Sequence, residues 1–429
     1  MSSPDQTAAG LVRSGLAPAE ARVDDSDGKV LRRLAGRMAD LAALPVMEEK
    51  RLLWKRHNRL ERTRPLVYCD PENGWNEVIP PASLACTGAL ARSWEMRLRR
   101  EIFYGESMGD DKPVEPVFDV GHVTAADDWG MEERYHKTDE AGSYVWDSPL
   151  RDYARDLPRL HSPRIVIDGE TTQACLDIAH RLFDGVLTVR LKSSWWWSLG
   201  ITYPAVRFRG LATLLYDLVD HPEELTELFH RISRGYLDKL DWLEERGLLS
   251  ANSDGTYVGS GGLGYTDELP AGSGPARCAG MWGFTESQET VSVSPEMYEQ
   301  FIFPFEKPIM DRFGLTCYGC CEPLHTRWHV VKRHHALRRV SCSPWADVEK
   351  MAGFLGDRYI YSMKPNPAAL AAPRIDEEAI REGLRRDLAM TRGCIVEIIM
   401  KDNHTVGRNP RNPVQWCRIA REEAERVGG

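Results

Sequence analysis

The spacing of apolar residues predicts helices in the first part of the chain. Over residues 30–64, Leu31, Leu34, Met38 and Leu41 follow the period of a helix with one buried face. The segment ends at residue 64, because the proline that follows disfavours helical backbone. Residues 66–163 have a mixed pattern, which predicts one further helix at 90–103 and a long polar loop at 127–148.

From about residue 164 the pattern changes to short apolar runs separated by helical stretches. We predict strands at 164–167, 187–191, 256–258, 278–282, 315–318, 338–342, 358–362 and 394–400. Helices are predicted at 210–246, 294–313, 345–355, 376–391 and 413–427, with Ser294 as an N-cap. Continuous apolar strands between helices are typical of a parallel sheet covered by helices. About eight strands favour an α/β fold, the (β/α)₈ TIM barrel, with a doubly wound open sheet as the alternative.

These patterns divide the chain into three parts. Residues 1–28, rich in small and polar side chains, predict a flexible leader. Residues 29–163 predict a helical, loop-rich N-terminal extension, and residues 164–429 predict the barrel. A glycine-rich stretch at 259–266 is interpreted either as an anion-binding loop or as a mobile lid.

Composition narrows the classes of partner and compartment. The chain of 429 residues is 42% hydrophobic and 28% charged, which is typical of a globular protein. A net charge of -9 argues against a nucleic-acid partner, and the basic run 332–335 is interpreted as a solvated face. The sequence contains no run of about 18 apolar residues, so no membrane-spanning helix is predicted. Ten cysteines without a secretion signal predict reduced thiols in the cytoplasm.

The densest candidate chemistry is the run Cys-Tyr-Gly-Cys-Cys-Glu-Pro-Leu-His at 317–325, directly after a predicted strand. Thiols, a carboxylate and an imidazole are ligands for a transition metal, although packed core cysteines are the alternative. Adjacent residues after a strand point in different directions, so we expect only one of Cys320 and Cys321 to bind. Glu322 and, from another strand end, His404 would complete the shell, and this mixed set favours zinc with an open position.

Other predicted strand ends also carry polar or aromatic side chains. We assign catalytic roles to Glu286, Lys364 and Asp402, which follow three different predicted strands. We assign substrate binding to Gln288 and to three aromatic residues that could wall a pocket, namely Trp196, Trp282 and Tyr318. Solvated loops and turn-side charges are the alternatives at these positions.

The chain resembles the uroporphyrinogen decarboxylase superfamily over roughly residues 164–429. The resemblance rests on Arg-Arg-Val-Ser-Cys-Ser-Pro-Trp-Ala-Asp-Val at 338–348, Leu-Gly-Asp-Arg at 355–358 and Lys-Pro-Asn-Pro at 364–367. It implies a TIM barrel. The arginine-rich N-terminal motif of the decarboxylase has no equivalent within residues 1–50, so the branch of corrinoid- and zinc-dependent methyltransferases is the closer one.

The resemblance also implies a ligand set from which this chain departs. The zinc members hold their metal through a His-x-Cys pair and a later cysteine. The cysteine of the pair falls on Cys320 or Cys321, but its histidine position holds no histidine, and the later cysteine falls near His404. Glu322 and His404 are the substitutes that we infer for the two missing ligands.

The activity implied by the resemblance is a zinc-dependent methyltransferase or demethylase. It would move a methyl group between a small methylated substrate and a corrinoid protein or a thiol. The chain has no cobalamin-binding loop of the form Asp-x-His-x-x-Gly, so a corrinoid would sit on a separate partner protein. A cofactor-independent decarboxylase or lyase is the alternative, followed by a barrel that only binds ligands. Assembly as a homodimer is left open.

Overall fold

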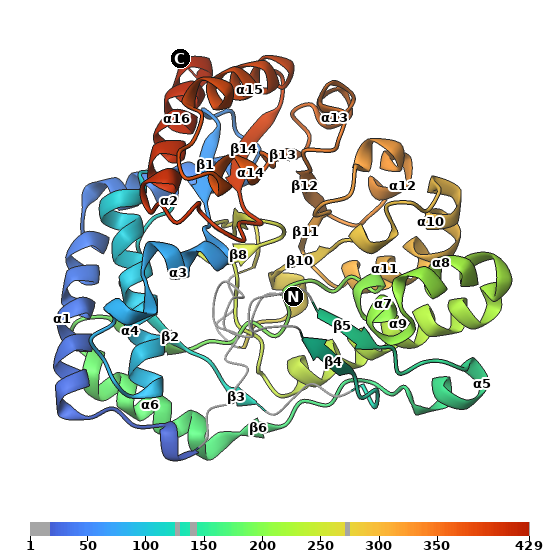
Figure 1. Ribbon diagram of the computed structural model, residues 1–429, viewed down its shortest axis with the longest axis horizontal. Coiled ribbons are helices and arrows are strands. Elements are labelled where there is room, and N and C mark those ends of the chain that lie inside the picture. Colours follow the sequence, from blue (N-terminus) through green and yellow to red (C-terminus); the bar gives the residue numbers. More distant parts are fainter. Residues whose placement is uncertain (1–17, 125–128, 138–143, 271–274, 429) are drawn as a thin grey trace.

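A curved parallel sheet forms the centre of the computed structural model, which describes residues 18–124, 129–137, 144–270 and 275–428. Its six strands lie in the order β1-β14-β13-β12-β11-β10, and every neighbouring pair is parallel (Figure 1). The strands are β1 Leu66–Cys69, β10 Trp282–Thr285, β11 Leu315–Tyr318, β12 Leu337–Cys342, β13 Ile360–Met363 and β14 Ile395–Met400. The alternation of strands and helices thus gives the α/β class that the sequence predicts.

Four small ladders lie outside this sheet. β2 Val117–Val120 pairs in parallel with β7 Thr188–Leu191, and β3 Val123–Thr124 pairs antiparallel with β6 Ile167–Asp168. The hairpins are β4 Arg134–Lys137 with β5 Tyr144–Asp147 and β8 Tyr257–Val258 with β9 Gly262–Leu263. Among the residues described, no ladder joins β2 and β7 to an edge of the six-stranded sheet. The strand pairing therefore does not confirm closure into an eight-stranded barrel.

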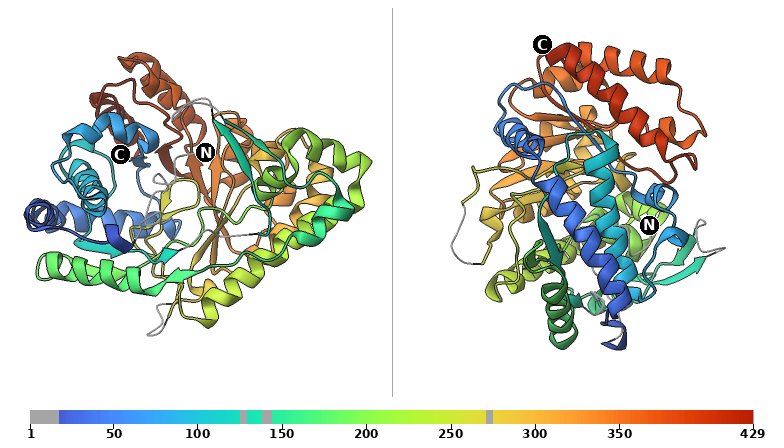
Figure 2. Two further views of the ribbon diagram at one scale, coloured as in Figure 1. Left: turned by 60° about the horizontal axis from the view of Figure 1, so that its bottom comes forward. Right: turned by 90° about the vertical axis from the view of Figure 1, so that its left-hand side faces the viewer.

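The helices that follow the later strands surround the outer side of the sheet, whereas β8 lies toward its centre (Figure 1). On another flank, α1 and α4 pack side by side (Figure 2). In the described segments, no helix combines the length and the apolarity needed to cross a membrane. The helices are α1 Asp25–Ala42, α2 Pro45–Asn58, α3 Trp75–Val78, α4 Ala89–Phe103, α5 Tyr153–Asp156, α6 Gly169–Phe183, α7 Thr202–Arg209, α8 Leu211–Asp220, α9 Pro222–Glu245, α10 Pro295–Phe301, α11 Phe303–Met310, α12 Trp328–Val331, α13 Val348–Leu355, α14 Ala368–Ala371, α15 Glu377–Met390 and α16 Arg411–Gly428.

Side-chain contacts across the sheet show how strongly it curves. β11 and β14 are separated by β13 and β12, so on a flat sheet they would lie about 14 Å apart. Nevertheless, Sγ of Cys321 and Oδ2 of Asp402, which follow these two strands, are only 3.8 Å apart. The carboxyl ends of the strands therefore converge on the concave side.

Strand pairing crosses the boundary predicted at residue 163. β1 and β2 belong to the segment 29–163, yet β1 pairs with β14 and β2 with β7. This segment therefore supplies part of the central sheet in addition to its helices. Of the predicted leader, residues 1–17 lie outside the described residues, while Asp25 already begins α1 behind the N-cap of Asp24.

Several local predictions need correction. The strand predicted at 278–282 begins at Trp282, because residues 278–280 form a 3-10 turn. The loop predicted at 127–148 contains the β4–β5 hairpin, although residues 127, 128 and 138–143 lie outside the description. The glycine-rich stretch 259–266 is buried as the turn and second strand of the β8–β9 hairpin, so the structure does not present it as a lid.

Candidate functional site

The candidate site lies where strands of the curved sheet reach their carboxyl ends. Glu286 follows β10, Cys320 follows β11, Lys364 follows β13, Lys401 follows β14 and Asp70 follows β1. In parallel sheets these ends share one edge, which is where α/β proteins place their active residues. Sequence-distant side chains are thus brought to a single region.

Two thiols and one carboxylate form the tightest cluster in this region. Sγ of Cys320 lies 3.7 Å from Sγ of Cys321, and the latter lies 3.8 Å from Oδ2 of Asp402. The potential ligand atoms of these residues all lie within 4.8 Å of one another. Cys320 is buried, whereas Cys321 and Asp402 are partly open to solvent. The two adjacent thiols therefore lie side by side, whereas adjacent residues after a strand were expected to point in different directions; which of them binds a metal stays a prediction.

The buried Lys401 contacts two members of this cluster. Nζ of Lys401 lies 2.6 Å from Oδ1 of Asp402 and 3.6 Å from Sγ of Cys320. Burial by itself lowers the pKa of Lys401, but the surrounding Cys320, Tyr257, Asp402 and Glu72 raise it well above its usual value. Lys401 therefore stays an ammonium at neutral pH and offsets negative charge on the cluster.

The thiol of Cys320 is held in its protonated form by its surroundings. Its hydrogen bond with Cys321 and its burial raise the pKa of Cys320 well above the usual range, while the Lys401 ammonium acts in the opposite direction. A thiol binds metal as the thiolate. A cation that enters between the two sulfurs would therefore displace protons, and its affinity would increase with pH.

Glu286 is a neutral acid close to the cysteines. Burial, together with electrostatic interactions with Glu289, Glu322 and Cys320, raises the pKa of Glu286 well above its usual value. Its carboxyl group accepts hydrogen bonds from Oγ of Ser198 at 3.0 Å and from the backbone N–H of Gln288 at 3.1 Å. A carboxyl group that keeps its proton at neutral pH can act as a general acid.

Glu322 and His404, both predicted as metal ligands, are not brought to the cluster. The carboxylate of Glu322 is fully buried and accepts the backbone N–H groups of Ser287 at 2.9 Å and of Cys320 at 2.8 Å. Glu322 thereby fixes the loop that carries the cysteines. His404 is exposed, and its Nδ1 lies 3.2 Å from Nδ2 of Asn73. Its neighbour Asp402 reaches the thiols instead.

The residues predicted to bind substrate are dispersed. The indole of Trp282 is buried and donates to the carbonyl of Gly264 at 2.9 Å. The phenol of Tyr318 is also buried, with its oxygen 2.8 Å from that of Tyr298. Trp196 packs against Phe313, with ring centroids 5.9 Å apart. Of the predicted set, Gln288 touches a site residue directly, through its backbone bond to Glu286.

Lys364 occupies a different part of the concave side. Its ammonium group is buried and donates to the hydroxyl and carbonyl groups of Ser362. Burial lowers the pKa of Lys364 to about 8, although the negative charge of Glu397 acts in the opposite direction. A lysine with a pKa near neutral can exchange protons, but within the described ranges no hydrogen bond or ion pair joins Lys364 to Cys320, Cys321 or Asp402.

Sequence reasoning missed the contribution of β1. Glu72 follows this strand, and burial raises its pKa to about 8 despite the nearby Lys401 ammonium. Glu72 and Asp402 both adopt positive φ, at 47° and 61°, which is uncommon for residues other than glycine and recurs at functional sites. The apolar run 66–69 followed by Asp70 is the signal that could have identified this strand end.

No protein-family model matches the chain, and no curated protein matches its sequence. Among solved structures, a methyltransferase from Methanosarcina mazei aligns with 87% of this chain and 97% of its own chain. The TM-score is 0.48 and the sequence identity is 10%.

Proposed function

We propose that the protein is a zinc-dependent methyltransferase or demethylase of the uroporphyrinogen decarboxylase-like type, built on a (β/α)₈ barrel. It would move a methyl group between a small methylated substrate and a thiol or a corrinoid carried by a separate partner protein. The observation that carries the proposal is the convergence of Cys320, Cys321 and Asp402 within 4.8 Å at the carboxyl ends of β11 and β14.

The donor set fits a catalytic zinc ion. Such sites have three protein ligands of the sulfur, nitrogen or carboxylate type and keep a further position for water or substrate. Two thiolates and one carboxylate carry three negative charges, which a divalent cation and the Lys401 ammonium would balance. In this proposal the zinc ligands are therefore Cys320, Cys321 and Asp402. They replace the ligands predicted from the sequence, which were one cysteine together with Glu322 and His404.

The residues around the cluster are suited to the transfer of a methyl group from an oxygen or nitrogen atom of the substrate. Zinc, when bound, would act as a Lewis acid on the substrate heteroatom. Glu286 holds a proton at neutral pH and lies near Cys320, so it would protonate a departing oxygen or nitrogen. Lys401 would keep Cys320 and Asp402 oriented, since it contacts both side chains.

One observation favours a cofactor-independent lyase or decarboxylase as the second candidate. The Lys401 ammonium already contacts Cys320 and Asp402, and together with the neutral Glu286 this forms an acid–base set that needs no metal. The two candidates differ in their response to chelators. Activity of the lyase would survive complete removal of zinc, whereas methyl transfer would be lost.

Native mass spectrometry with elemental analysis tests the metal site directly. We expect one zinc per chain in protein reconstituted with zinc. Cys321→Ser and Asp402→Asn each remove a ligand and should weaken binding by about 10- to 100-fold or more. His404→Ala is the matched control and should retain the metal, because its imidazole lies outside the cluster. Methyl transfer from a methylated substrate to free cobalamin that an added reductant keeps as Co(I), followed by absorbance, should decline in parallel with metal content.

Two results would contradict the proposal. One is a reconstituted protein that binds no zinc. The other is a Cys321→Ser, Asp402→Asn double variant that keeps full zinc stoichiometry, which would place the metal elsewhere. Loss of zinc in His404→Ala but not in Asp402→Asn would restore the ligand set first predicted from the sequence.

A further inference from the structure

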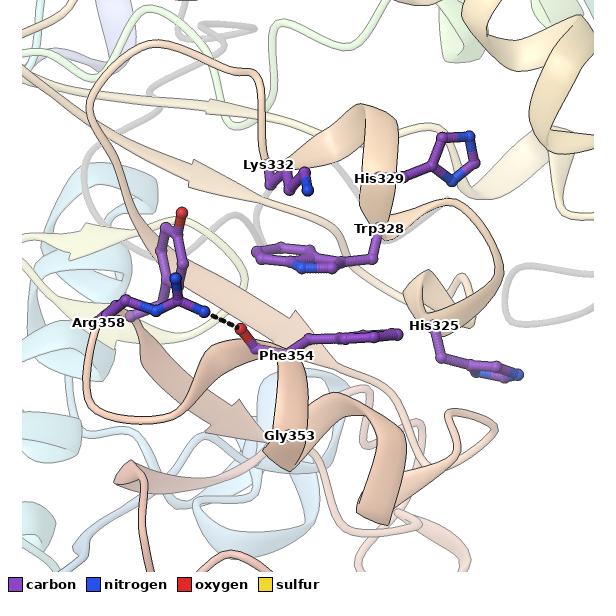
Figure 3. A pocket seen from close by; sticks show the side chains of 8 residues that line it. His325, Trp328, His329, Lys332, Gly353, Phe354 and Arg358 are labelled. Atoms are coloured by element: carbon purple, nitrogen blue, oxygen red, sulfur yellow. Dashed lines mark hydrogen bonds between the residues drawn. The ribbon is translucent and has the colours of Figure 1, made fainter.

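A separate cavity lies in the outer helical layer, between α12 and the end of α13 (Figure 3). Its volume is about 320 Å³, at the lower end of the roughly 300–1,000 Å³ typical of small-molecule sites. Arg358 and Tyr359 lie at the amino end of β13, away from the edge that carries the cysteines. The residues that line the cavity are His325, Trp328, His329, Lys332, Gly353, Phe354, Arg358 and Tyr359.

Aromatic side chains form the flat surfaces of this cavity. The rings of Trp328 and Phe354 are nearly parallel, with an interplanar angle of 13° and centroids 6.3 Å apart. Tyr359 meets Trp328 edge-on, with centroids 5.2 Å apart. Trp328 is almost fully buried, so its ring is fixed before any ligand arrives. Rigid aromatic faces of this kind favour a planar ring as ligand.

The polar part of the lining is entirely basic. Within the described residues the side chain of Lys332 has no ion-pair or hydrogen-bond partner, and the guanidinium group of Arg358 donates only to the carbonyl of Phe354 at 3.1 Å. Nδ1 of His325 accepts the backbone N–H of Asp347 at 3.1 Å, which leaves its Nε2 free to donate. The exposed His329 adds a further imidazole, and in the part of the chain that the structure describes no acidic residue lines the cavity.

This charge is unusual for the molecule. The chain carries a net charge of -9, and many of its arginines lie in ion pairs with acidic side chains. Asp347, whose backbone contacts His325, has its carboxylate paired with Lys350 at 3.1 Å. Lys332 and Arg358 lie beside aromatic rings and have no carboxylate partner among the residues that the structure describes, and such cations match an anion attached to a planar ring.

We propose that this cavity binds a planar aromatic anion, that is, an aromatic ring bearing a phosphate or a carboxylate. The ring would pack against the half-buried Phe354, beside the fixed edge of Trp328, and the anionic group would lie between Lys332 and Arg358. The basic run 332–335, interpreted from the sequence as a solvated face, would thus contribute Lys332 to a binding site. The proposal is independent of the metal cluster, because no lining residue belongs to that cluster.

Isothermal titration calorimetry with adenosine monophosphate and with 2-naphthoate tests the proposal on the intact protein. We expect at least one of them to bind with a dissociation constant below about 1 mM. Adenosine has the aromatic ring without the anionic group, and inorganic phosphate has the anionic group without the ring. Each should bind about tenfold more weakly than the nucleotide. Preference for the nucleotide identifies a phosphate ligand, and preference for naphthoate identifies a carboxylate.

Two variants locate the binding. The double charge reversal Lys332→Glu, Arg358→Glu changes exposed residues and should weaken binding of the preferred probe by about tenfold or more. Phe354→Ala should weaken it through loss of stacking. The matched control is Lys29→Glu, Arg374→Glu, which makes the same charge change at two exposed residues outside the cavity. It should leave the affinity unchanged.

Clear outcomes would overturn the proposal. One is the absence of binding by both aromatic anions up to about 10 mM. Another is an affinity that falls equally in the charge-reversal variant and in its control, which would indicate a general effect of net charge. Unchanged affinity in both cavity variants, verified as folded by circular dichroism, would place the ligand elsewhere.

Discussion

Two buried carboxyl groups, those of Glu397 and Glu306, show how neighbouring side chains set the protonation state. Burial raises the pKa of Glu397, but Arg339 at 2.9 Å and His57 at 3.2 Å outweigh this and hold the pKa far below its usual value. Glu306 has phenolic partners instead, chiefly Tyr298 at 3.0 Å. Burial therefore raises the pKa of Glu306 to about 8. At neutral pH one group is ionised and the other carries a proton.

This difference predicts a dependence of stability on pH. Between its unfolded pKa of 4.5 and about 8, folded Glu306 holds a proton that the unfolded chain has lost. Wild-type stability should therefore fall as pH rises through this range, relative to Glu306→Gln. The slope is at most about 1.4 kcal/mol per pH unit. Urea unfolding at about pH 5 and about pH 7.5 measures the difference.

Glu349→Gln is the control for this experiment. Glu349 is an exposed glutamate of α13, and its replacement should change stability by about the same small amount at both pH values. A difference between wild type and Glu306→Gln that stays constant from pH 5 to 7.5 would show that Glu306 is ionised in the folded protein.

At the scale of elements, the β8–β9 hairpin fills the concave side of the sheet. Gly259 and Gly261 have positive φ, at 66° and 121°. A Cβ on Gly261 would lie 2.3 Å from Cγ2 of Ile399, and one on Gly262 would lie 2.2 Å from Cζ of Arg339. The glycines therefore allow the hairpin backbone to approach the side chains of β12 and β14. Their role is close packing inside the sheet.

Gly261→Ala should destabilise the protein by about 2–5 kcal/mol, because it combines an unfavourable φ with a steric clash. The matched control is Gly383→Ala in α15, where an added Cβ meets nothing within 4 Å. That substitution should stabilise the protein by about 0.5–1 kcal/mol. Denaturant unfolding of both variants measures the contrast. Equal stability of Gly261→Ala and wild type would mean that the hairpin is not packed as described.

At the scale of the whole molecule, the two ends of the chain are joined through the sheet. β1 is hydrogen-bonded to β14, and the buried Asp111 binds Arg64 at 2.7 Å and Arg421 of α16 at 2.9 Å. The backbone N–H of Val67, in β1, also donates to Asp111 at 2.8 Å. The amino-terminal segment is thus an integral part of the core around β14.

A fragment of residues 164–429 should therefore fail to fold cooperatively. It would lack β1 and would expose the edge of β14, whose residues are all buried in the intact chain. We expect loss of a sigmoidal urea transition by circular dichroism and recovery on mixing with residues 1–163. Cooperative unfolding of the isolated fragment, with wild-type midpoint, would show that the predicted boundary separates independent units.

The sequence by itself determined the α/β class, most of the later strands and several helix ends. β11 lies where it was predicted, and Ser294 caps α10 by accepting the N–H of Met297 at 3.2 Å. These features depend on apolar period and capping, which act over a few neighbouring residues. β1 and β2 escaped detection because both lie in a segment without a regular alternation of strands and helices, whereas β11, which is equally short, lies between two predicted helical stretches.

Only the tertiary structure decided which candidate side chains share a space. From the sequence, the predicted metal ligands were one of Cys320 and Cys321 together with Glu322 and His404, whereas Asp402 was assigned a catalytic role. The choice depends on the curvature of the sheet, which brings the loops after β11 and β14 together. It also depends on the two backbone N–H groups that donate hydrogen bonds to the carboxylate of Glu322. Both are long-range properties, because they join residues up to 82 positions apart along the chain.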